Sequence, residues 1–397
     1  MASLGVYIQV PFCQTKCTYC NFHTGVVSPE RFAPYAAAVC REISGVAVGS
    51  LEGTIGRPVE CQFDTVYFGG GTPSLLDPAS LAKILDTLRC SFQPSATSLE
   101  ITLEADPETI TAEKSSAWID AGFNRISLGV QSFQDAELRA SGRMHRRDNI
   151  FKAVEVLRGA GFQNISMDLI AGLPHQTRES WEASLTELLS VRPEHVSIYM
   201  LEIDEGSRLG KESLAGGSRY SAGAIPPDDV IAECYESACA RLAEHQHEYE
   251  HYEISNWALP GNRSRHNLKY WRREPYCGFG AGAHSFDGRT RWANVHDSAR
   301  YAVCIEQGVS PREQVEAVTP EQALEEEFFL GLRQLEGIDL ARIERDCNGA
   351  FAARADALRN RISKLESQGL VQFEGGKLRL APDRLTVSNE VFVELLG

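Results

Sequence analysis

The sequence lacks a long hydrophobic run and has comparatively little positive charge. No apolar stretch approaches the roughly 18 residues that a membrane-spanning helix needs. The first residues, Met1–Gly5, show neither the basic region nor the cleavage site of a signal peptide, so we expect none. The 39 Lys and Arg residues are outnumbered by 54 Asp and Glu residues, which leaves a net charge of −15. We therefore expect a cytoplasmic protein that does not bind nucleic acid in general, because a phosphate backbone requires a basic surface.

The eleven cysteines are scattered and odd in number, which argues against a framework of disulfides. Without an export signal, reduced thiols are the expected state. A chain of 397 residues is long enough for one large α/β domain and a smaller one. The thiols are therefore available for metal chemistry.

Cys13, Cys17 and Cys20 follow an apolar run, residues 6–10, that suits a buried strand ended by Pro11. Their C-x3-C-x2-C spacing lets one loop direct three sulfurs at a common centre. Thiolates favour zinc or an iron–sulfur cluster. A structural zinc site requires four protein ligands, and the loop offers no fourth cysteine. A four-iron cube on three thiolates would leave one iron open to another ligand.

Buried strands alternate regularly with helical patterns in the first half of the chain, which predicts successive βαβ units and a parallel sheet. Right-handed crossovers in chain order then give a barrel or part of one. The six expected strands lie near residues 6–10, 65–68, 99–104, 125–130, 165–171 and 195–202.

Polar residues stand at or near the ends of several of these strands. Gly69-Gly70-Gly71-Thr72 follows the second strand, and three glycines let a ligand approach the backbone closely. Glu104, Gln131 and Asp168 belong to the third, fourth and fifth strands. Each alone would suit a turn or a cap. Because ligands bind at the carboxyl edge of such a sheet, the set together predicts a site beside the cysteine loop.

The regular alternation ends after Glu202. Residues 204–228 are rich in Gly, Ser, Asp and Pro and are expected to form a mobile loop or lid. From about 310, helical segments and a hairpin about Gly375-Gly376 predict a small α+β module that resembles a winged helix and packs on the barrel. We thus expect a barrel core over 1–203, a barrel extension over 204–310 and a C-terminal module over 311–397.

The cysteine spacing and the glycine motif resemble the radical S-adenosylmethionine (SAM) superfamily, and nearly the whole chain is similar to its oxygen-independent coproporphyrinogen III oxidase-like branch. The resemblance implies a partial (βα)6 TIM-type barrel. It also implies a [4Fe–4S] cluster whose open iron chelates SAM, which one electron cleaves to a 5′-deoxyadenosyl radical. Cys13, Cys17 and Cys20 match the cluster ligands. The positions that match SAM contacts are Tyr7, Tyr19, Gly70, Gly71, Thr72, Glu104, Gln131, Arg143 and Asp168.

Within this branch the chain resembles the heme chaperones more than the oxidases. The oxidases carry a further cysteine where Phe22 stands and an extension before the first strand, whereas six residues precede Tyr7 here. His266-Asn-Leu-Lys-Tyr-Trp271 matches the HNxxYW motif that is associated with heme in the chaperones. The resemblance makes His266 the first candidate axial ligand, with Cys277 and His284 as weaker ones. One departure is Gln9, where the family usually has histidine.

This resemblance implies a protein that binds [4Fe–4S], SAM and heme and transfers heme to respiratory enzymes at the membrane. Peripheral contact with the membrane, an electron donor of the flavodoxin or ferredoxin type and a homodimer are compatible with it. One alternative is the oxidative decarboxylation of coproporphyrinogen III. Another is a radical SAM enzyme that acts on RNA, which the acidic charge and the lack of a basic, aromatic-rich module disfavour.

Overall fold

The computed structural model describes residues 3–49, 62–95, 98–244 and 247–396. Six parallel strands form the centre of the fold and neighbour one another in chain order, which confirms the predicted βαβ succession. They are β1 (Leu4–Val10), β2 (Phe63–Gly70), β3 (Glu100–Ala105), β4 (Arg125–Gln131), β5 (Ile165–Ala171) and β6 (His195–Met200).

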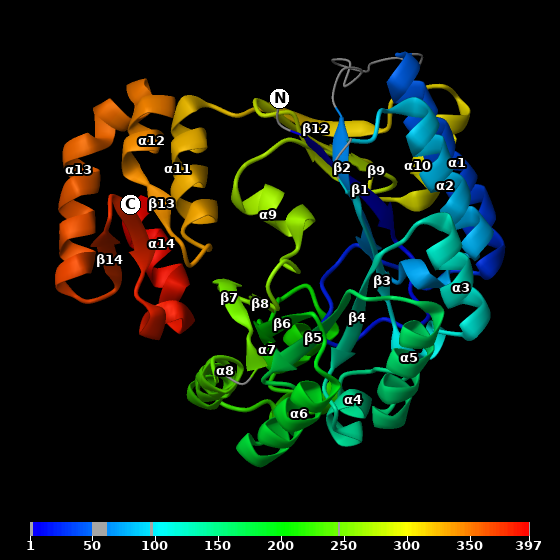
Figure 1. Cartoon of the computed structure of the whole chain (residues 1–397), viewed down its shortest axis with the longest axis horizontal. Helices are drawn as coiled ribbons and strands as arrows, with labels where there is room; N and C mark the ends of the chain where they lie inside the picture. The colour runs from blue at the N-terminus through cyan, green and yellow to red at the C-terminus, as the bar shows by residue number, and fades with distance from the viewer. Residues whose placement is uncertain (1–2, 50–61, 96–97, 245–246, 397) are drawn as a thin grey trace.

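Helices cover the outer face of this curved sheet (Figure 1). They are α1 (Phe32–Val48), α2 (Pro78–Ser91), α3 (Ala112–Ala121), α4 (Asp135–Ala140), α5 (Arg147–Ala160) and α6 (Arg178–Val191). Local sequence sets their ends: the Asp77 and Thr111 side chains accept backbone N–H bonds at the starts of α2 and α3, and Gly122 ends α3 in a left-handed conformation. Short 3-10 turns lie at Pro29–Arg31, Pro73–Leu75 and Pro107–Thr109.

Further strands extend the sheet at both edges, and the sheet does not close into a barrel. At one edge β9 (Tyr276–Phe279) runs parallel to β1, followed by antiparallel β10 (His284–Phe286), β11 (Thr290–Asn294) and β12 (Arg312–Ala317). At the other edge β8 (Asn256–Ala258) and β7 (Glu250–Glu253) continue antiparallel from β6. The described residues thus form a partial barrel, as predicted, within a sheet of twelve strands.

The segment expected to be a loop, residues 204–228, contains helical structure. α7 (Arg208–Leu214) and a 3-10 segment, Arg219–Ala224, precede α8 (Asp228–Leu242). Ser207 begins α7 by accepting a bond from the Gly210 N–H, and the Leu209 N–H donates to the Thr18 carbonyl at 2.8 Å. This contact with a distant loop, which local composition does not encode, holds the segment against the cysteine loop.

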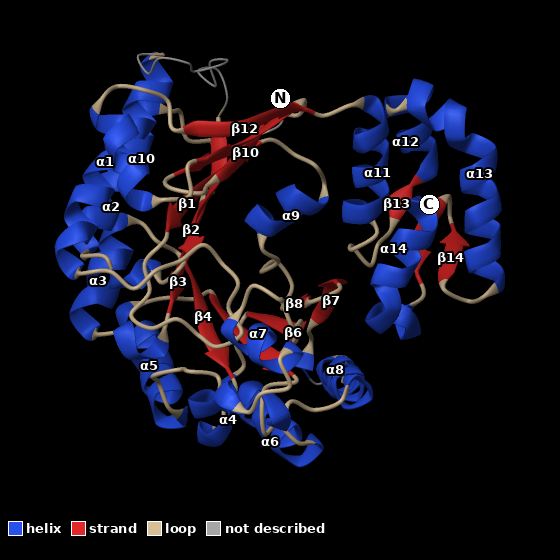
Figure 2. Cartoon of the chain, turned by 180° about the vertical axis from the view of Figure 1, so that it is seen from behind, coloured by secondary structure: helices blue, strands red, loops and turns tan. Residues whose placement is uncertain are grey.

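Two further helices complete the barrel region. α10 (Ser298–Glu306) packs beside α1 on the outside, and α9 (Arg265–Trp271) lies on the concave side of the sheet (Figure 2). No helix among the described residues is both long enough and apolar enough to cross a membrane.

The C-terminal module combines helices with a three-stranded antiparallel sheet. Its elements are α11 (Pro320–Gly331), β13 (Ile338–Asp339), α12 (Leu340–Asp346), α13 (Asn348–Ser367), β14 (Val371–Glu374), β15 (Lys377–Leu380), a 3-10 segment Pro382–Val387 and α14 (Ser388–Leu396). β14 and β15 form the predicted hairpin about Gly375-Gly376. The module packs on the barrel extension, where Arg333 forms an ion pair with the fully buried Glu253 at 2.7 Å. Because β12 belongs to the large sheet, that sheet reaches Ala317.

Candidate functional site

The cysteine loop follows β1 and places its three thiols near one end of the parallel strands. Two backbone bonds fix the loop: the Cys13 N–H donates to the Gly25 carbonyl, and the Thr18 N–H to the Ser141 carbonyl, each at 3.1 Å. Cys13, Cys17 and Cys20 are free and only partly exposed. Burial raises the pKa of Cys13 and the pKa of Cys20. Cys20 adds to the rise at Cys13, and Cys17 adds to the rise at Cys20.

The donor set of this loop suits an iron–sulfur cluster. Among the described residues, no three His, Cys, Asp or Glu side chains converge as ligands of one metal ion would. Thiolates on a cube each bind a different iron, so they lie farther apart than the ligands of a single zinc ion. The Arg143 guanidinium lies beside Cys17 and brings a positive charge to this loop.

Arg143 connects the cysteine loop to the strand ends. Its Nη1 atom lies 3.5 Å from the Cys17 sulfur, and its Nη2 atom donates to the Gly129 carbonyl at 2.7 Å. The same guanidinium forms a close ion pair with Asp106. The charges of Asp106 and nearby groups outweigh the effect of burial and raise the pKa of Arg143, which therefore stays charged.

The glycine motif brings bare backbone to the same edge. Gly70 has φ +107°, a conformation that glycine adopts at little cost. A Cβ atom on Gly71 would lie 2.4 Å from the Phe12 carbonyl oxygen, so no side chain fits between the motif and the cysteine loop. This close approach explains why position 71 is a glycine. It leaves a backbone cradle next to the three thiols.

Glu104 is the acidic group of this cradle. It accepts the Gly70 N–H at 3.1 Å and the Tyr67 hydroxyl at 2.8 Å. Burial, with a contribution from the charge of Asp168, raises its pKa to about 7 in spite of these bonds. Tyr7 stacks near Tyr67 with ring centroids 6.1 Å apart. A carboxyl group so buried favours a cationic partner, such as an ammonium group.

Gln131 and Asp168 lie on neighbouring strands of the same wall. Gln131 has φ +65°, unusual for a residue with a side chain, where the register between β4 and β5 shifts. Asp168 accepts a bond from the Ser127 hydroxyl at 3.2 Å, and burial raises its pKa. Tyr19 lies near Cys17 and Arg143, and burial raises the pKa of its hydroxyl. The cradle, Glu104, Arg143 and Asp168 thus lie at the same edge of the sheet.

Asp106 belongs to this arrangement, although the sequence analysis did not select it. It holds Arg143 and accepts a bond from the Thr72 hydroxyl at 3.4 Å. It comes directly after β3, the position that drew attention to Glu104, so the strand-end rule applies to it equally. The structure makes it the residue that orients the arginine.

Gln9 packs against the glycine motif. A Cβ on Gly70 would lie 2.4 Å from the Gln9 Nε2 atom, and the backbone carbonyl of Gln9 accepts the Tyr35 hydroxyl at 2.8 Å. The departure from the usual histidine therefore lies beside the cradle and not among the thiols.

His266 lies inside the molecule, 1% exposed, in α9. Its Nδ1 atom is bonded to the Thr65 hydroxyl and its Nε2 atom to the Tyr270 hydroxyl, each at 2.9 Å. Burial lowers its pKa to about 3, so the ring is neutral at pH 7. Neutral imidazole suits iron. Coordination through Nε2 would require Tyr270 to move away.

The two weaker heme candidates differ in access. Cys277 is buried, and burial raises its pKa to about 12. His284 is exposed, and its ring centroid lies 6.4 Å from that of His296, which lies 4.2 Å from that of His23 in the cysteine loop. Three imidazoles from distant segments therefore gather beside the cysteine loop, a proximity that spacing along the chain could not indicate.

Comparison with known proteins agrees with this geometry. Residues 7–188 match the radical SAM superfamily, and residues 318–383 match the HemN C-terminal domain. The heme chaperone HemW of Bacillus subtilis is 35% identical over 395 residues, which cover 98% of each chain. The heme chaperone HemW of Mycobacterium tuberculosis is 34% identical, over 99% of this chain and 95% of its own.

A solved structure shares the whole fold. Coproporphyrinogen III oxidase (HemN) from Escherichia coli, described as a radical SAM enzyme, aligns with a TM-score of 0.82 over 99% of this chain and 90% of its own. At 23% identity this likeness concerns the fold alone. It confirms the partial barrel with a C-terminal module.

Proposed function

The chain belongs to the radical SAM superfamily and, within it, to the HemW family, and on this basis we propose that it is a heme chaperone. The observation that carries the proposal is full-length similarity to HemW chaperones in a chain that keeps the three-thiol loop. Membership of the superfamily implies a [4Fe–4S] cluster and SAM. The acceptors would be heme-requiring respiratory proteins, and the site of action the cytoplasm.

The residues at this edge of the sheet have separate roles in this proposal. Cys13, Cys17 and Cys20 would hold the cluster, which supplies single electrons when bound. Arg143, fixed by Asp106, would bind the SAM carboxylate, since a guanidinium fork matches a carboxylate. The cradle of Gly70, Gly71 and Thr72 would hold the SAM amino group, with Glu104 as its counter-charge.

The remaining matched residues would shape the walls of the SAM site. Tyr7 and Tyr19 would flank SAM, and Gln131 and Asp168 would contact its polar groups from β4 and β5. An electron donor of the flavodoxin or ferredoxin type would be required for any cleavage of SAM. Peripheral contact with a membrane surface and the formation of a homodimer would be compatible with this function.

For heme we propose His266 as the axial ligand, with Cys277 and His284 as the alternatives. The support is the HNxxYW motif on α9 and the neutral state of the imidazole. Release of the Tyr270 hydroxyl would free Nε2 for iron. The neighbouring rings of Tyr67 and Tyr270, each with a centroid 5.2 Å from that of His266, would offer flat surfaces.

Titration of the purified protein with hemin tests the proposal. We expect saturable binding followed by transfer to an apo-hemoprotein, both seen by absorption. His266→Ala should alter the heme spectrum, whereas the exposed His175→Ala should leave it unchanged. If both variants match the wild type, His266 is not the ligand. A wild-type protein that neither binds nor transfers hemin is not a chaperone.

The second candidate function is oxidation of coproporphyrinogen III, which the shared fold keeps open. It predicts protoporphyrinogen when the reconstituted protein is given SAM, a reductant and coproporphyrinogen III without oxygen. We expect none, because Phe22 replaces the additional cysteine that the oxidases carry. Product formation at the rate of an oxidase assayed in parallel would favour the enzyme.

A further inference from the structure

The C-terminal module contacts the last turn of α9, the helix that carries the HNxxYW motif. Figures 1 and 2 show α9 between the concave side of the sheet and the module. A helix of seven residues is too short to be stable by itself in water. The last turn of α9 therefore depends on the contacts that it makes with the rest of the protein.

Two consecutive arginines connect this turn to the module. Arg273 forms ion pairs with Glu326 at 2.8 Å and with Glu327 at 3.2 Å, and all three side chains are mostly buried. Arg272 donates to the Gln334 side chain at 3.1 Å. Because water screens buried charges less than exposed ones, the two ion pairs of Arg273 are the strongest of these contacts.

The module also covers the last residue of the motif. The guanidinium of Arg333 lies over the Trp271 ring, 4.5 Å from its centroid. The indole nitrogen of Trp271 is buried and forms no hydrogen bond with a described residue. A buried donor without a partner is unfavourable, since water would bind the same group in an open state. The wound turn therefore carries a cost that its contacts with the module offset.

The backbone directly after the turn is strained. Arg273 has φ +51°, in the left-handed region that is unfavourable for a residue with a Cβ atom. Its N–H donates to the Tyr270 carbonyl at 3.2 Å, and the Arg272 N–H donates to the Leu268 carbonyl at 3.0 Å. Such strain persists only where surrounding contacts impose it. The ion pairs of Arg273 thus hold a conformation that the local sequence does not favour.

The same turn controls access to the His266 imidazole. Its Nε2 atom is bonded to the Tyr270 hydroxyl at 2.9 Å, and Tyr270 belongs to the turn that the module contacts. Unwinding of this turn would move Tyr270 away. His266 could stay in place, because its Nδ1 atom is bonded to the Thr65 hydroxyl in β2 at 2.9 Å. The wound turn is therefore a closed state in which Nε2 is occupied.

We propose that the C-terminal module is a latch that keeps the heme motif closed, and that loss of the Arg273 ion pairs unwinds the end of α9 and opens His266 to heme iron. The inference rests on the proposed chaperone function and adds the regulation of its heme site. Because only the open state binds iron through Nε2, the latch lowers the apparent affinity for heme.

The substitution Arg273→Gln opens the latch with little damage elsewhere. Glu326 keeps its ion pair with Arg291 at 2.9 Å, and Glu327 keeps its ion pair with Arg342. No carboxylate of the latch is therefore left without a cation, and the module should stay folded.

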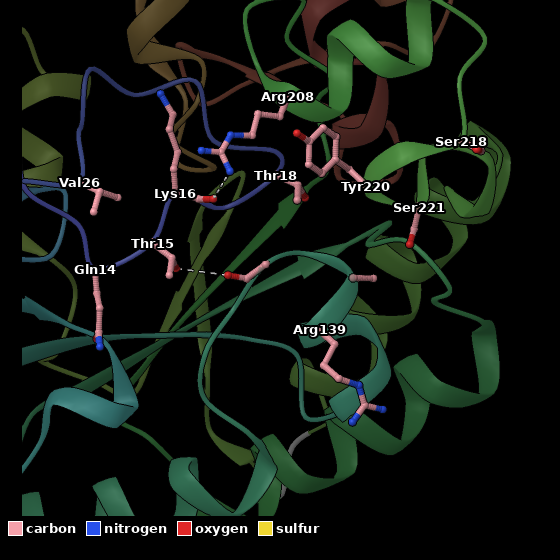
Figure 3. Close-up of a pocket in the computed structure, with 12 residues that line it drawn as sticks. Gln14, Thr15, Lys16, Thr18, Val26, Arg139, Arg208, Ser218, Tyr220 and Ser221 are labelled. Carbon is pink, nitrogen blue, oxygen red and sulfur yellow. Dashed lines mark hydrogen bonds between the residues drawn. The ribbon is translucent and has the colours of Figure 1, made fainter.

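Two controls account for the loss of one positive charge, which by itself would weaken the binding of anionic hemin. Arg300→Gln removes an exposed ion pair with Glu313 in the barrel region. Arg139→Gln removes an exposed arginine of α4, whose guanidinium points away from Lys16 of the cysteine loop (Figure 3). Neither residue contacts α9 by an ion pair or a hydrogen bond between the described residues.

Hydrogen exchange over residues 265–274 measures the latch without heme. We expect the amides of the last turn to exchange about tenfold or more faster in Arg273→Gln than in the wild type, and at the wild-type rate in both controls. Hemin titration should then give about tenfold tighter binding for Arg273→Gln alone. Adding His266→Ala to Arg273→Gln should remove that gain.

Unchanged exchange in Arg273→Gln would overturn the proposal, because the module would then not hold the turn. Faster exchange with unchanged or weaker hemin binding would also overturn it, since the turn would not limit access to the iron ligand. If Arg273→Gln does not fold, the milder Glu326→Gln should show the same two changes in smaller measure, and their absence would overturn the latch. If no variant and no wild type binds hemin, the chaperone function itself is removed, and with it the heme role of the latch.

Discussion

Arg143 faces Cys17 across the edge of the sheet, with its Nη1 atom 3.5 Å from the sulfur, while Asp106 holds the other end of the guanidinium. Strands β3 and β4 fix these positions through Asp106 and the Gly129 carbonyl. A single arginine therefore links the thiols to the space in which we place SAM. The two halves of the proposed site are coupled through this side chain.

Replacing Arg143 with lysine should weaken SAM binding and leave the cluster in place. Lysine keeps the charge but not the fork that a carboxylate accepts in two bonds. A charged hydrogen bond contributes about 1.5–3 kcal/mol, so we expect the Kd for SAM to rise about tenfold or more. Calorimetric titration of the reconstituted protein measures it, with the surface substitution Arg147→Lys as control. An unchanged Kd would remove Arg143 from the SAM site.

Glu104 should make SAM binding depend on pH near neutrality. Because its pKa is raised to about 7, the carboxyl group is largely neutral at pH 6 and ionised at pH 8. SAM is cationic at its sulfonium and amino groups, so its affinity should increase over that interval. Glu104→Gln should abolish the increase, and the exposed Glu113→Gln should retain it. Titrations at both pH values decide the matter; the same increase in Glu104→Gln would contradict this role.

The ionisation of Glu42 should make the protein less stable as the pH rises toward neutrality. This buried side chain of α1 accepts bonds from the Tyr301 hydroxyl, the Gly280 N–H and the Asn294 amide, yet burial raises its pKa to about 7. Between the unfolded pKa of about 4.5 and 7, the folded state holds more protons. The free energy of unfolding therefore falls with pH there, by up to about 3 kcal/mol.

Thermal unfolding at pH 5 and pH 7.5 measures this effect. Between these two pH values, the melting temperature of the wild type should fall by several degrees more than that of Glu42→Gln, because glutamine does not titrate. Exposed Glu113→Gln serves as the reference. Parallel changes in all three proteins would show that another group is responsible.

The ion pair between Arg333 and Glu253 should hold the C-terminal module to the barrel extension. Glu253 has no exposed side-chain surface, and Arg333 lies in the module at 2.7 Å. Arg333→Met would leave a buried carboxylate without its cation and should cost about 3 kcal/mol. The control is Arg379→Met, which removes an arginine from an exposed ion pair. It should change the free energy of unfolding by about 0.5 kcal/mol or less. Urea unfolding measures the effect of both substitutions. An equally small loss of stability in the two variants would show that the pair of Arg333 and Glu253 does not hold the module to the barrel extension.

The local sequence pattern was sufficient to predict the structural elements that depend on neighbouring residues alone. The β/α alternation indicated β1 to β6, and Gly375-Gly376 indicated the hairpin of the C-terminal module. The three thiols were visible because one loop carries them all. Asp106 was missed only because Glu104, two residues earlier, drew attention at the same strand end.

Contacts between distant segments could not be predicted in this way. The position of α7 against the cysteine loop involves the bond from the Leu209 N–H to the Thr18 carbonyl, and these two residues are far apart in the chain. The buried state of His266 depends on Thr65 in β2. Each of these features depends on tertiary packing, which cannot be predicted from local composition.

Counting iron and acid-labile sulfide after anaerobic reconstitution tests the central claim most directly. The wild type should hold about four of each per chain, and Cys17→Ser should lose them, while Cys90→Ser, an exposed cysteine outside the loop, should retain them. A wild type that holds one zinc ion and no sulfide, or a Cys17→Ser variant with a full cluster, would contradict the account.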